Sequence, residues 1–206
     1  MNVLVTGGNG RMARHLESNN NITYYSPGRD EMDLASYDSI DSYILDKQID
    51  GLVLNAFQYL PSELNLDIFK AVEHEFLRAT QVNLLATLYM YLKLKDNLKF
   101  IVLLSTGLDP VHETNSIYYR NNKANLGDLL ERIYYVDKKV KTIFIHPGHM
   151  HDDYTFKQSA VQVTKMIENL DKFKNLGTYG IFEKDKMEYR ELESIKSYHT
   201  LNTFEL

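Results

Sequence analysis

Short apolar runs alternate with longer amphipathic segments along the whole of this 206-residue chain. The runs have the length of buried strands, and the segments between them carry apolar residues at the spacing of a helix face. Repetition of this kind is typical of βα units, in which a helix connects two parallel strands and packs on their sheet. We therefore predict an α/β fold, a doubly wound parallel sheet with helices on both faces.

The predicted strands are residues 2–6, 22–26, 51–55, 100–105, 142–146 and 178–183. The predicted helices are residues 11–19, 37–47, 66–80, 82–95, 118–135 and 157–173. No repeat, low-complexity linker or change of composition divides the chain, so we expect a single domain over residues 1–206. Its last part, residues 183–206, is charged and aromatic, and we expect it to be only partly ordered.

Charge and cysteine content restrict the function and the location of the protein. The chain has 23 basic and 28 acidic residues, a net charge of -5, so its overall charge does not attract nucleic acid or an anionic membrane. It has no cysteine, which excludes disulfides, thiolate metal sites and cysteine nucleophiles. It shows no signal-peptide pattern, and no apolar run reaches the roughly 18 residues of a membrane span. We expect a cytoplasmic protein that binds neither nucleic acid nor membranes.

A glycine-rich turn follows the first predicted strand, and its pattern is Gly8-x-Gly10-x-x-Ala13. Between a strand and a helix, this pattern is the fingerprint of a dinucleotide-binding, Rossmann-like fold. Its glycines let the backbone approach a pyrophosphate, which the start of the helix then stabilises. An ordinary glycine-rich turn is the alternative. On the first interpretation, the residues that contact a dinucleotide here are Gly7, Gly8, Asn9, Gly10, Arg11 and Met12.

The end of the second predicted strand bears on which dinucleotide is bound. In this fold an acidic residue at that place takes the ribose 2′-hydroxyl, whereas an arginine accommodates a 2′-phosphate. Here no carboxylate stands at the strand tip, Arg29 precedes Asp30, and Arg11 in the turn is a second cation. We therefore expect NADP(H) to be favoured over NAD(H). The alternative is that Arg29 is an ordinary solvated surface charge.

Six further motifs stand in chain order at the ends of predicted strands or on predicted helices. They are Asp33-Leu34, Leu54-Asn55-Ala56, Val82-Asn83-Leu84, Ser105-Thr106, Tyr119-x-x-x-Lys123 and His146-Pro147-Gly148. Together with the glycine-rich turn, they resemble the short-chain dehydrogenase/reductase superfamily over most of the chain. The turn resembles the extended or atypical branch, because Ala13 stands where the family most often has a third glycine. The resemblance implies an NAD(P)(H)-dependent oxidoreductase that transfers hydride between the nicotinamide and a carbonyl or secondary alcohol.

The spacing Tyr-x-x-x-Lys occurs six times in this chain, so the motif alone identifies nothing. The pair Tyr119 and Lys123 is selected by its place, on the helix after the strand that ends at Ser105 and before the strand that leads to Pro147. Residues four apart project from one helix face, so Lys123 can lie beside Tyr119 and lower the pKa of its phenol. We interpret the other five pairs as solvated or interface residues.

The resemblance also implies roles for single residues. Tyr119 would protonate the carbonyl oxygen, and Ser105 or its neighbour Thr106 would hold that oxygen. Asn83 would support a proton relay through water to Lys123, with local packing within its helix as the alternative. The predicted catalytic residues are thus Asn83, Ser105, Tyr119 and Lys123. Beyond the turn, the predicted cofactor contacts are Arg29, Asp33, Leu34, Asn55, Ala56, Phe57, Tyr119, Lys123, Pro147 and Gly148.

Other interpretations stay open. Nucleotide-sugar epimerases, dehydratases and reductases share the expected fold, and a non-catalytic dinucleotide sensor would bind a partner protein instead of a small carbonyl or alcohol substrate. The histidines and aspartates at 146–153 are of the types that bind metal, but the Pro-Gly motif already explains this segment and we expect no metal. The helices at 66–80 and 82–95 carry more apolar surface than one sheet face needs, so we expect a homodimer.

Overall fold

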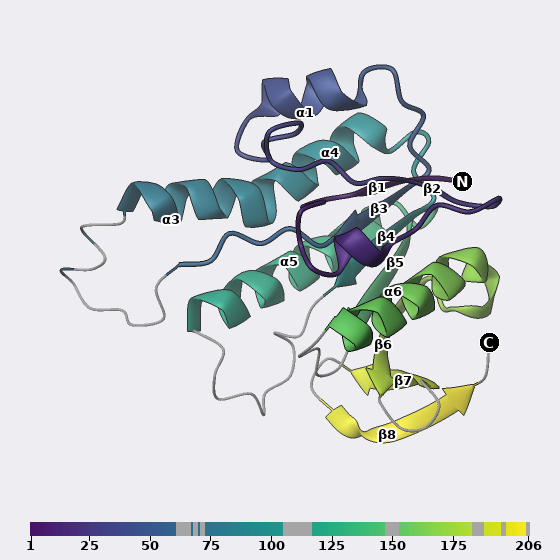
Figure 1. Cartoon of the computed structure of the whole chain (residues 1–206). Coiled ribbons are helices and arrows are strands. Elements are labelled where there is room, and N and C mark those ends of the chain that lie inside the picture. Colours follow the sequence, from purple (N-terminus) through teal and green to yellow (C-terminus); the bar gives the residue numbers. More distant parts are fainter. Residues whose placement is uncertain are drawn as a thin grey trace.

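The computed structural model describes residues 1–60, 67, 70, 73–104, 117–146, 153–182, 188–194 and 197–204. Its centre is an eight-stranded sheet in the order β2-β1-β3-β4-β5-β6-β7-β8 (Figure 1). The strands from β1 to β6 pair in parallel, whereas β7 pairs antiparallel with β6 and β8 antiparallel with β7. The strands are β1 (Asn2–Val5), β2 (Thr23–Tyr25), β3 (Gly51–Leu54), β4 (Phe100–Leu104), β5 (Lys141–His146), β6 (Leu176–Phe182), β7 (Glu188–Ser194) and β8 (Ser197–Phe204).

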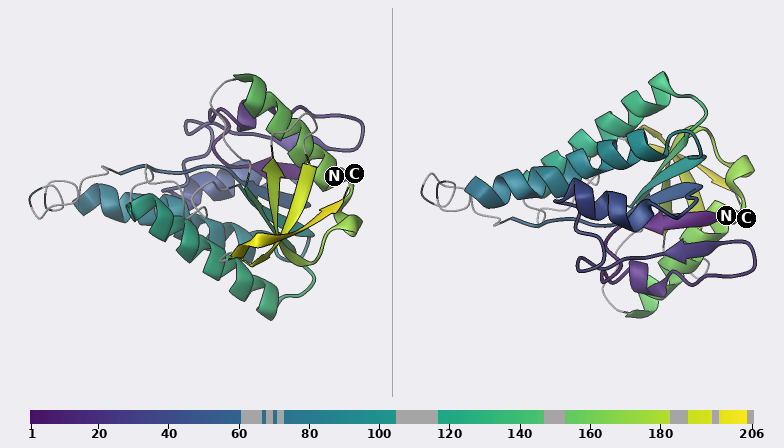
Figure 2. Two further views of the ribbon diagram at one scale, coloured as in Figure 1. Left: turned by 90° about the horizontal axis from the view of Figure 1, so that it is seen from below. Right: turned by 90° about the horizontal axis from the view of Figure 1, so that it is seen from above.

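Helices cover both faces of the sheet, so the predicted doubly wound α/β architecture is confirmed (Figures 1 and 2). The α-helices are α1 (Tyr37–Ile44), α3 (Glu73–Thr80), α4 (Ala86–Leu94), α5 (Ile117–Val136) and α6 (Asp153–Glu168). A π-helical segment, η2 (Gln81–Leu85), joins α3 to α4, and the described residues also form the short 3-10 helices η1 (Ala13–His15) and η3 (Leu170–Lys172). No helix within the described ranges has both the length and the apolar character that crossing a bilayer requires.

Alternate residues of the central strands enter two hydrophobic cores, one on each face of the sheet. In β1, Val3 and Val5 pack with η1 and α6, whereas Leu4 between them packs with α1, α4 and α5. In β4, Val102 belongs to the first core and Leu103 to the second. Burial on both faces explains why these strands are continuous apolar runs in the sequence.

The helix predicted over residues 11–19 is wrong, because only the single turn of η1 forms there. The Ser18 hydroxyl accepts a hydrogen bond from the N–H of Tyr24 at 2.9 Å. The Asn19 side chain accepts from the N–H groups of Asn21 and Ile22 at 2.8 and 3.0 Å. Serine and asparagine side chains that bind nearby backbone in this way compete with helix formation. The glycine-rich turn therefore leads into a helix too short to supply a large dipole.

Two strands lie in the region 183–206, which was predicted to be only partly ordered. Its described residues, 188–194 and 197–204, form β7 and β8, which extend the sheet beyond β6. Both strands carry charged or small polar residues where Val and Ile are usual. The sequence therefore shows no apolar run that would predict these strands.

The chain reverses its direction of winding between β1 and β3. From β1 it passes to β2 on one side, and β3 then pairs with the other side of β1. In open α/β sheets such a reversal leaves a crevice at the carboxyl ends of the strands, and ligands bind there. Figures 1 and 2 show α3 and α5 side by side, extending beyond the sheet on one side.

Candidate functional site

A cavity of about 710 Å³ opens at the carboxyl ends of β1, β3 and β4. We call the group Arg29, Asp33 and Arg78 its arginine end, and the group Phe57, Leu104 and Lys123 its lysine end. The arginine end follows β2 and the lysine end lies at β4, three strand spacings or roughly 14 Å away. The cavity therefore suits an elongated ligand. It is lined by Gly7, Gly10, Arg11, Met12, Pro27, Arg29, Met32, Asp33, Leu34, Asn55, Ala56, Phe57, Gln58, Tyr59, Arg78, Val82, Leu104, Lys123 and Phe156.

The glycine-rich turn forms the floor of the cavity between these ends, and its glycines are required by the space around them. Gly7 has a positive φ of 70°, which other residues adopt only with strain. A Cβ at Gly8 would lie 1.9 Å from the carbonyl oxygen of Ser26, and the N–H of Gly8 donates to the carbonyl of Pro27 at 2.8 Å. Gly8 therefore holds the turn against the segment after β2 and does not itself line the cavity.

The residues after β3 fix the same turn from the other side. The Thr6 hydroxyl, buried at the end of β1, accepts hydrogen bonds from the N–H groups of Asn55 and Ala56 at 3.1 and 3.0 Å. The Asn55 side-chain amide donates to the carbonyls of Thr6 and Gly7 at 3.2 and 3.1 Å. Asn55 thus lines the cavity and also positions the glycine-rich turn.

Arg11 and Met12, which follow the turn, present groups that bind anions. Within the described part of the chain, their N–H groups donate no hydrogen bond to backbone oxygens. The Arg11 guanidinium lies over the ring of Phe156, 5.7 Å from its centre, at the edge of the cavity. Backbone amides and a guanidinium at a glycine-rich turn suit phosphate oxygens. Because η1 is so short, Arg11 supplies positive charge that a longer helix would otherwise provide.

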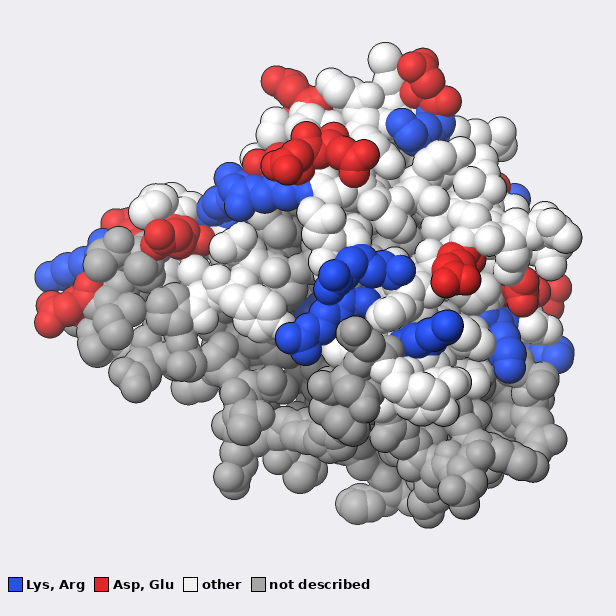
Figure 3. Space-filling model, viewed as in Figure 1, with Lys and Arg blue, Asp and Glu red and all other residues white. Residues whose placement is uncertain are grey.

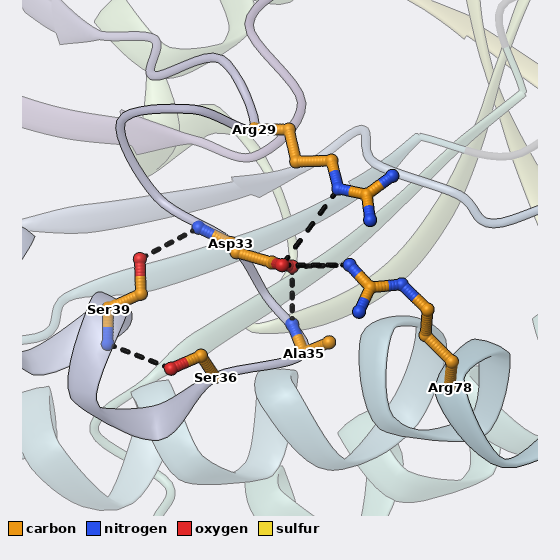
Figure 4. A network of polar contacts seen from close by, with 6 residues as sticks. All are labelled: Arg29, Asp33, Ala35, Ser36, Ser39 and Arg78. Carbon is orange, nitrogen blue, oxygen red and sulfur yellow. Dashed lines mark hydrogen bonds and ion pairs between the residues drawn. The ribbon is translucent and has the colours of Figure 1, made fainter.

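The arginine end is organised around one carboxylate (Figure 4). Arg78 Nη2 donates to both carboxylate oxygens of Asp33, at 2.9 and 2.8 Å, and Arg29 Nε lies 3.9 Å from the second. The N–H of Ala35 donates to Asp33 Oδ1 at 2.9 Å. The N–H of Asp33 itself donates to the hydroxyl of Ser39 at 2.9 Å. Burial alone would raise the pKa of Asp33, but the Arg78 and Ala35 hydrogen bonds and the charges of both arginines outweigh it and lower that pKa.

Among the described residues, three arginines and a lysine thus line the cavity against one carboxylate, Asp33. Figure 3 shows Lys and Arg side chains gathered near the middle of the face it presents, with most Asp and Glu side chains nearer its periphery. The described part of the cavity wall is positive although the whole chain carries a net charge of -5. Such a local excess of positive charge attracts anionic ligands.

The lysine end contains a single buried cation. Lys123, on α5, is 2% exposed, and its Nζ donates to the carbonyl of Leu104 at 3.1 Å. The same Nζ lies 5.3 Å from the centre of the Phe57 ring. Burial lowers the pKa of Lys123 to about 8. Tyr119 lies one turn earlier on α5, and its side chain is outside the described part of the structure.

Asn83 does not line the cavity. It lies in the π-helical segment η2, is 3% exposed, and binds the backbone of Gln58 through both ends of its amide. Its Oδ1 accepts from the N–H of Gln58 at 2.8 Å, and its Nδ2 donates to the carbonyl of Gln58 at 3.1 Å. Both bonds hold the segment after β3 that carries Phe57 and Tyr59 to the cavity wall. Asn83 therefore positions this wall segment, and its part in a proton relay stays a prediction.

Several predicted residues cannot be placed. Ser105, Thr106, Pro147 and Gly148 lie outside the described residues, and so do most of the candidate metal ligands at 146–153.

Of the competing Tyr-x-x-x-Lys pairs, Tyr89 and Lys93 have a clear structural role. The Tyr89 hydroxyl and the Lys93 ammonium both donate to Asp41 Oδ2, at 2.8 and 3.0 Å.

Arg78 was not among the residues predicted from the sequence. This residue is the one arginine of the helix predicted over residues 66–80, and it stands four residues before Val82, which also lines the cavity. That spacing places both side chains on one helix face and was the available signal. Its partner Asp33 is 45 residues away in the sequence, and no local pattern reveals such a pair. Seven other wall residues were not predicted as contacts either: Pro27, Met32, Gln58, Tyr59, Val82, Leu104 and Phe156.

Comparison with known proteins identifies the fold. No protein-family model and no curated protein sequence matches the chain. A carbonyl reductase from Pseudomonas aeruginosa PAO1 is 15% identical over 87% of this chain and 95% of its own, with a TM-score of 0.65. A Brucella ovis oxidoreductase of the short chain dehydrogenase/reductase family, in complex with a partially ordered NAD, is 13% identical over 88% of this chain and 99% of its own, with a TM-score of 0.63.

A dTDP-4-dehydrorhamnose reductase from Clostridium acetobutylicum ATCC 824 is also similar, with 15% identity over 89% of this chain and 75% of its own, and a TM-score of 0.62. All three neighbours share their architecture with this chain at low sequence identity. Among the described residues, the glycine-rich turn follows β1, Asn55 and Ala56 follow β3, and Lys123 lies on α5 after β4. The chain therefore has the fold of the short-chain dehydrogenases/reductases.

Proposed function

We propose that this protein is an NADP(H)-dependent oxidoreductase that reduces a carbonyl compound or oxidises a secondary alcohol. The observation that carries the proposal is one cavity that joins a glycine-rich turn and arginines to a buried lysine of lowered pKa. That lysine follows Tyr119 by one helical turn. The Pseudomonas carbonyl reductase has also been determined with NADP, and the Brucella oxidoreductase with NAD.

The residues of the cavity fit a nicotinamide dinucleotide. The N–H groups of Arg11 and Met12, with the Arg11 guanidinium, would bind the pyrophosphate. Arg29, whose side chain is 67% exposed at the rim, would bind the 2′-phosphate that distinguishes NADP(H) from NAD(H). Asp33 and Leu34 would contact the adenine, as the family resemblance implies. The cofactor would supply hydride at the lysine end, since the other end holds the phosphate-binding groups.

The protein's own part in the reaction is proton transfer and orientation. Tyr119 would donate a proton to the carbonyl oxygen during reduction and accept one from the hydroxyl during oxidation. Lys123 would stabilise the phenolate form of Tyr119, because a cation one helical turn away favours the charged phenol. Ser105 or Thr106 would hold the substrate oxygen. Asn83 would act at a distance, by fixing the segment that carries Phe57 against Lys123.

The test is a panel of small carbonyl compounds incubated with NADPH, followed by the loss of absorbance at the nicotinamide band. We expect at least one aldehyde or ketone to be reduced. Binding of NADPH without turnover of any compound, in the unmodified protein and in Tyr119→Phe alike, would instead favour the non-catalytic sensor.

A nucleotide-sugar reductase is the second candidate, on the specific observation that a dTDP-4-dehydrorhamnose reductase shares the fold over 89% of this chain. The Ala13 form of the glycine-rich turn is in keeping with that branch. The panel therefore includes a dTDP-linked 4-keto sugar beside simple ketones. Turnover of the nucleotide sugar alone would select this candidate.

The protein would act as a homodimer. A groove of about 210 Å³ between η2, α4 and α5 is lined by four leucines together with Asn125, Asp128 and Arg132. Leu85 in this groove and Leu92 on the same helix run are exposed, and so much apolar surface favours a covering partner. In a two-fold dimer, Asp128 of one copy and Arg132 of the other would pair twice. Light scattering should show a dimer, and Leu88→Arg should show a monomer; a monomeric unmodified protein would contradict this.

A further inference from the structure

Two arginines approach Asp33 at the arginine end, and they do so unequally (Figure 4). Arg78 Nη2 donates to both carboxylate oxygens at 2.9 and 2.8 Å, whereas Arg29 Nε lies 3.9 Å from the nearer one. The Arg78 side chain is 31% exposed and the Arg29 side chain 67%. The carboxylate is thus satisfied by Arg78, and Arg29 stays at the rim of the cavity without a short hydrogen bond to it.

We propose that Arg78 determines the choice between NADP(H) and NAD(H) by occupying Asp33, which leaves Arg29 available for a 2′-phosphate. The proposal rests on the proposed function, and it assigns to Arg78 a specificity role that acts through Asp33 and Arg29. Arg78 is therefore a positioning residue, and no direct contact between it and the phosphate is required.

The charges of the arginine end give the physical reason. Arg29 and Arg78 together outweigh Asp33 by one positive charge. Without Arg78 the carboxylate would have Arg29 as its remaining cationic neighbour, four residues away in the same loop. An unoccupied carboxylate would compete with the 2′-phosphate for Arg29 and would also repel it. NAD(H) has no 2′-phosphate, so its binding would be affected much less.

The surrounding hydrogen bonds indicate which of the two arginines can respond to a bound ligand. Asp33 is held by the N–H of Ala35 and by the hydroxyl of Ser39. The turn that carries Arg29 is held by Met32 N–H, which donates to the carbonyl of Gly28 at 3.0 Å. Arg78 is anchored on α3, and its Nε is buried with no hydrogen-bond partner among the described residues. Releasing Arg78 from Asp33 would leave a partly buried charge without compensation, so the exposed Arg29 is the one that responds to a ligand.

Equilibrium binding of NADPH and NADH to four proteins tests this proposal. These are the unmodified chain, Arg78→Gln, Asp33→Asn and the double variant. Adenosine 2′,5′-bisphosphate and AMP serve as probes that carry no nicotinamide. We expect Arg78→Gln to lower the NADPH-to-NADH affinity ratio about tenfold, mainly by weakening NADPH. In the double variant the competing carboxylate is absent, so the ratio should return towards that of the unmodified chain.

A control variant and a substitute variant show whether the change of affinity ratio is specific to Arg78. Arg14→Gln removes the same charge from η1, outside the cavity, and should leave the ratio nearly unchanged. If Arg78→Gln folds poorly in thermal unfolding, Arg78→Met takes its place, because it keeps the aliphatic stem and buries no polar group. The same loss of ratio is expected of it.

A purely structural role for Arg78 would weaken both nucleotides equally and leave the ratio unchanged, which would overturn the inference. A ratio that falls in Arg78→Gln but does not recover in the double variant would overturn it as well, because Asp33 would then not be the intermediary. If the unmodified protein binds neither nucleotide nor either probe, the proposed function itself fails, and that outcome is distinct from both of these.

Discussion

The two ends of the cavity differ in the exposure and pairing of their positively charged groups. At the arginine end, two partly exposed guanidinium groups share a carboxylate that loop hydrogen bonds hold in place. At the lysine end, one ammonium is 2% exposed and has its pKa lowered by burial. Partly exposed paired charges cost the fold little and suit binding, whereas a buried charge costs stability and suits proton chemistry. This difference predicts that the two ends divide binding and chemistry between them.

The largest effect is expected at Tyr119. Tyr119→Phe removes the titrating hydroxyl and keeps the ring, so NADPH affinity should survive while turnover falls by at least about 100-fold. The control is Tyr89→Phe, another member of a Tyr-x-x-x-Lys pair, whose hydroxyl binds Asp41 outside the cavity. Steady-state kinetics measure the turnover of the two variants. Equal turnover in both variants would show that Tyr119 is not the proton donor, and that the chemistry does not take place at the lysine end.

Lys123→Met should separate activity from stability. Turnover should fall, and the pH optimum of any remaining alcohol oxidation should move upward, because the phenol of Tyr119 loses its neighbouring cation. The free energy of unfolding should rise by roughly 1–2 kcal/mol at neutral pH, since a buried charge is replaced by an apolar chain of similar length. Chemical denaturation measures this change. A loss of stability would show that the buried ammonium is well compensated in the folded protein.

The pH dependence of the same variant supplies a second check. In the unfolded chain Lys123 has its ordinary pKa of 10.5, whereas in the folded protein the pKa is about 8. Between these values the unfolded state binds more protons, so the stability of the unmodified protein gains a contribution as the pH rises through this window. Lys123→Met should lack that contribution.

Gly8→Ala should damage binding without touching either end directly. The added Cβ would lie 1.9 Å from the Ser26 carbonyl oxygen, a backbone atom, so the turn must shift. We expect the free energy of unfolding to fall by about 1–3 kcal/mol and NADPH and NADH affinities to fall together. Denaturation and fluorescence titration measure these quantities. Unchanged affinity for both nucleotides would mean that the glycine-rich turn does not hold the dinucleotide.

The smallest effect is expected from Asp33 in acid. Its pKa lies below the ordinary 3.8, so its contribution to stability is present above that pH and is lost as the pH falls through the folded value. Because the side chain is about one-third exposed, the contribution should be under about 1 kcal/mol. Asp33→Asn should therefore be slightly less stable than the unmodified protein at pH 6, and the gap should close as the pH falls through the pKa of Asp33 in the folded protein. A gap that widened in acid would contradict the ion pair.

The predictable parts of this molecule are those with a local signal. The parallel strands were found because burial on both faces makes them continuous apolar runs, as in Phe100–Leu104. Gly7 and Gly10 were predicted because a turn whose backbone approaches a ligand closely needs glycines, and these recur at a fixed spacing in the sequence. The lysine end was found through the place of Tyr119 and Lys123 in the chain order, since their spacing alone recurs six times.

The parts that sequence could not predict depend on side chains that bind distant or competing backbone. Ser18 and Asn19 bind the backbone of Ile22 and Tyr24 through hydrogen bonds that helical periodicity does not reveal. Arg78 joins the arginine end only because α3 lies beside the segment after β2, far away in sequence. Asn83 is buried in η2 as part of the predicted motif, but the motif does not reveal that its amide binds the backbone of Gln58, 25 residues earlier in the sequence.

The central claim is that one ligand spans both ends. Nuclear magnetic resonance of the 24.0 kDa protein, labelled at arginine and lysine side-chain nitrogens, tests it directly. Saturating NADPH should shift the signals of Arg29 and Lys123 together, whereas adenosine 2′,5′-bisphosphate should shift that of Arg29 and leave that of Lys123 in place. If NADPH shifts neither signal, or shifts Arg29 alone just as the fragment does, the two ends do not form one dinucleotide site and the account is wrong.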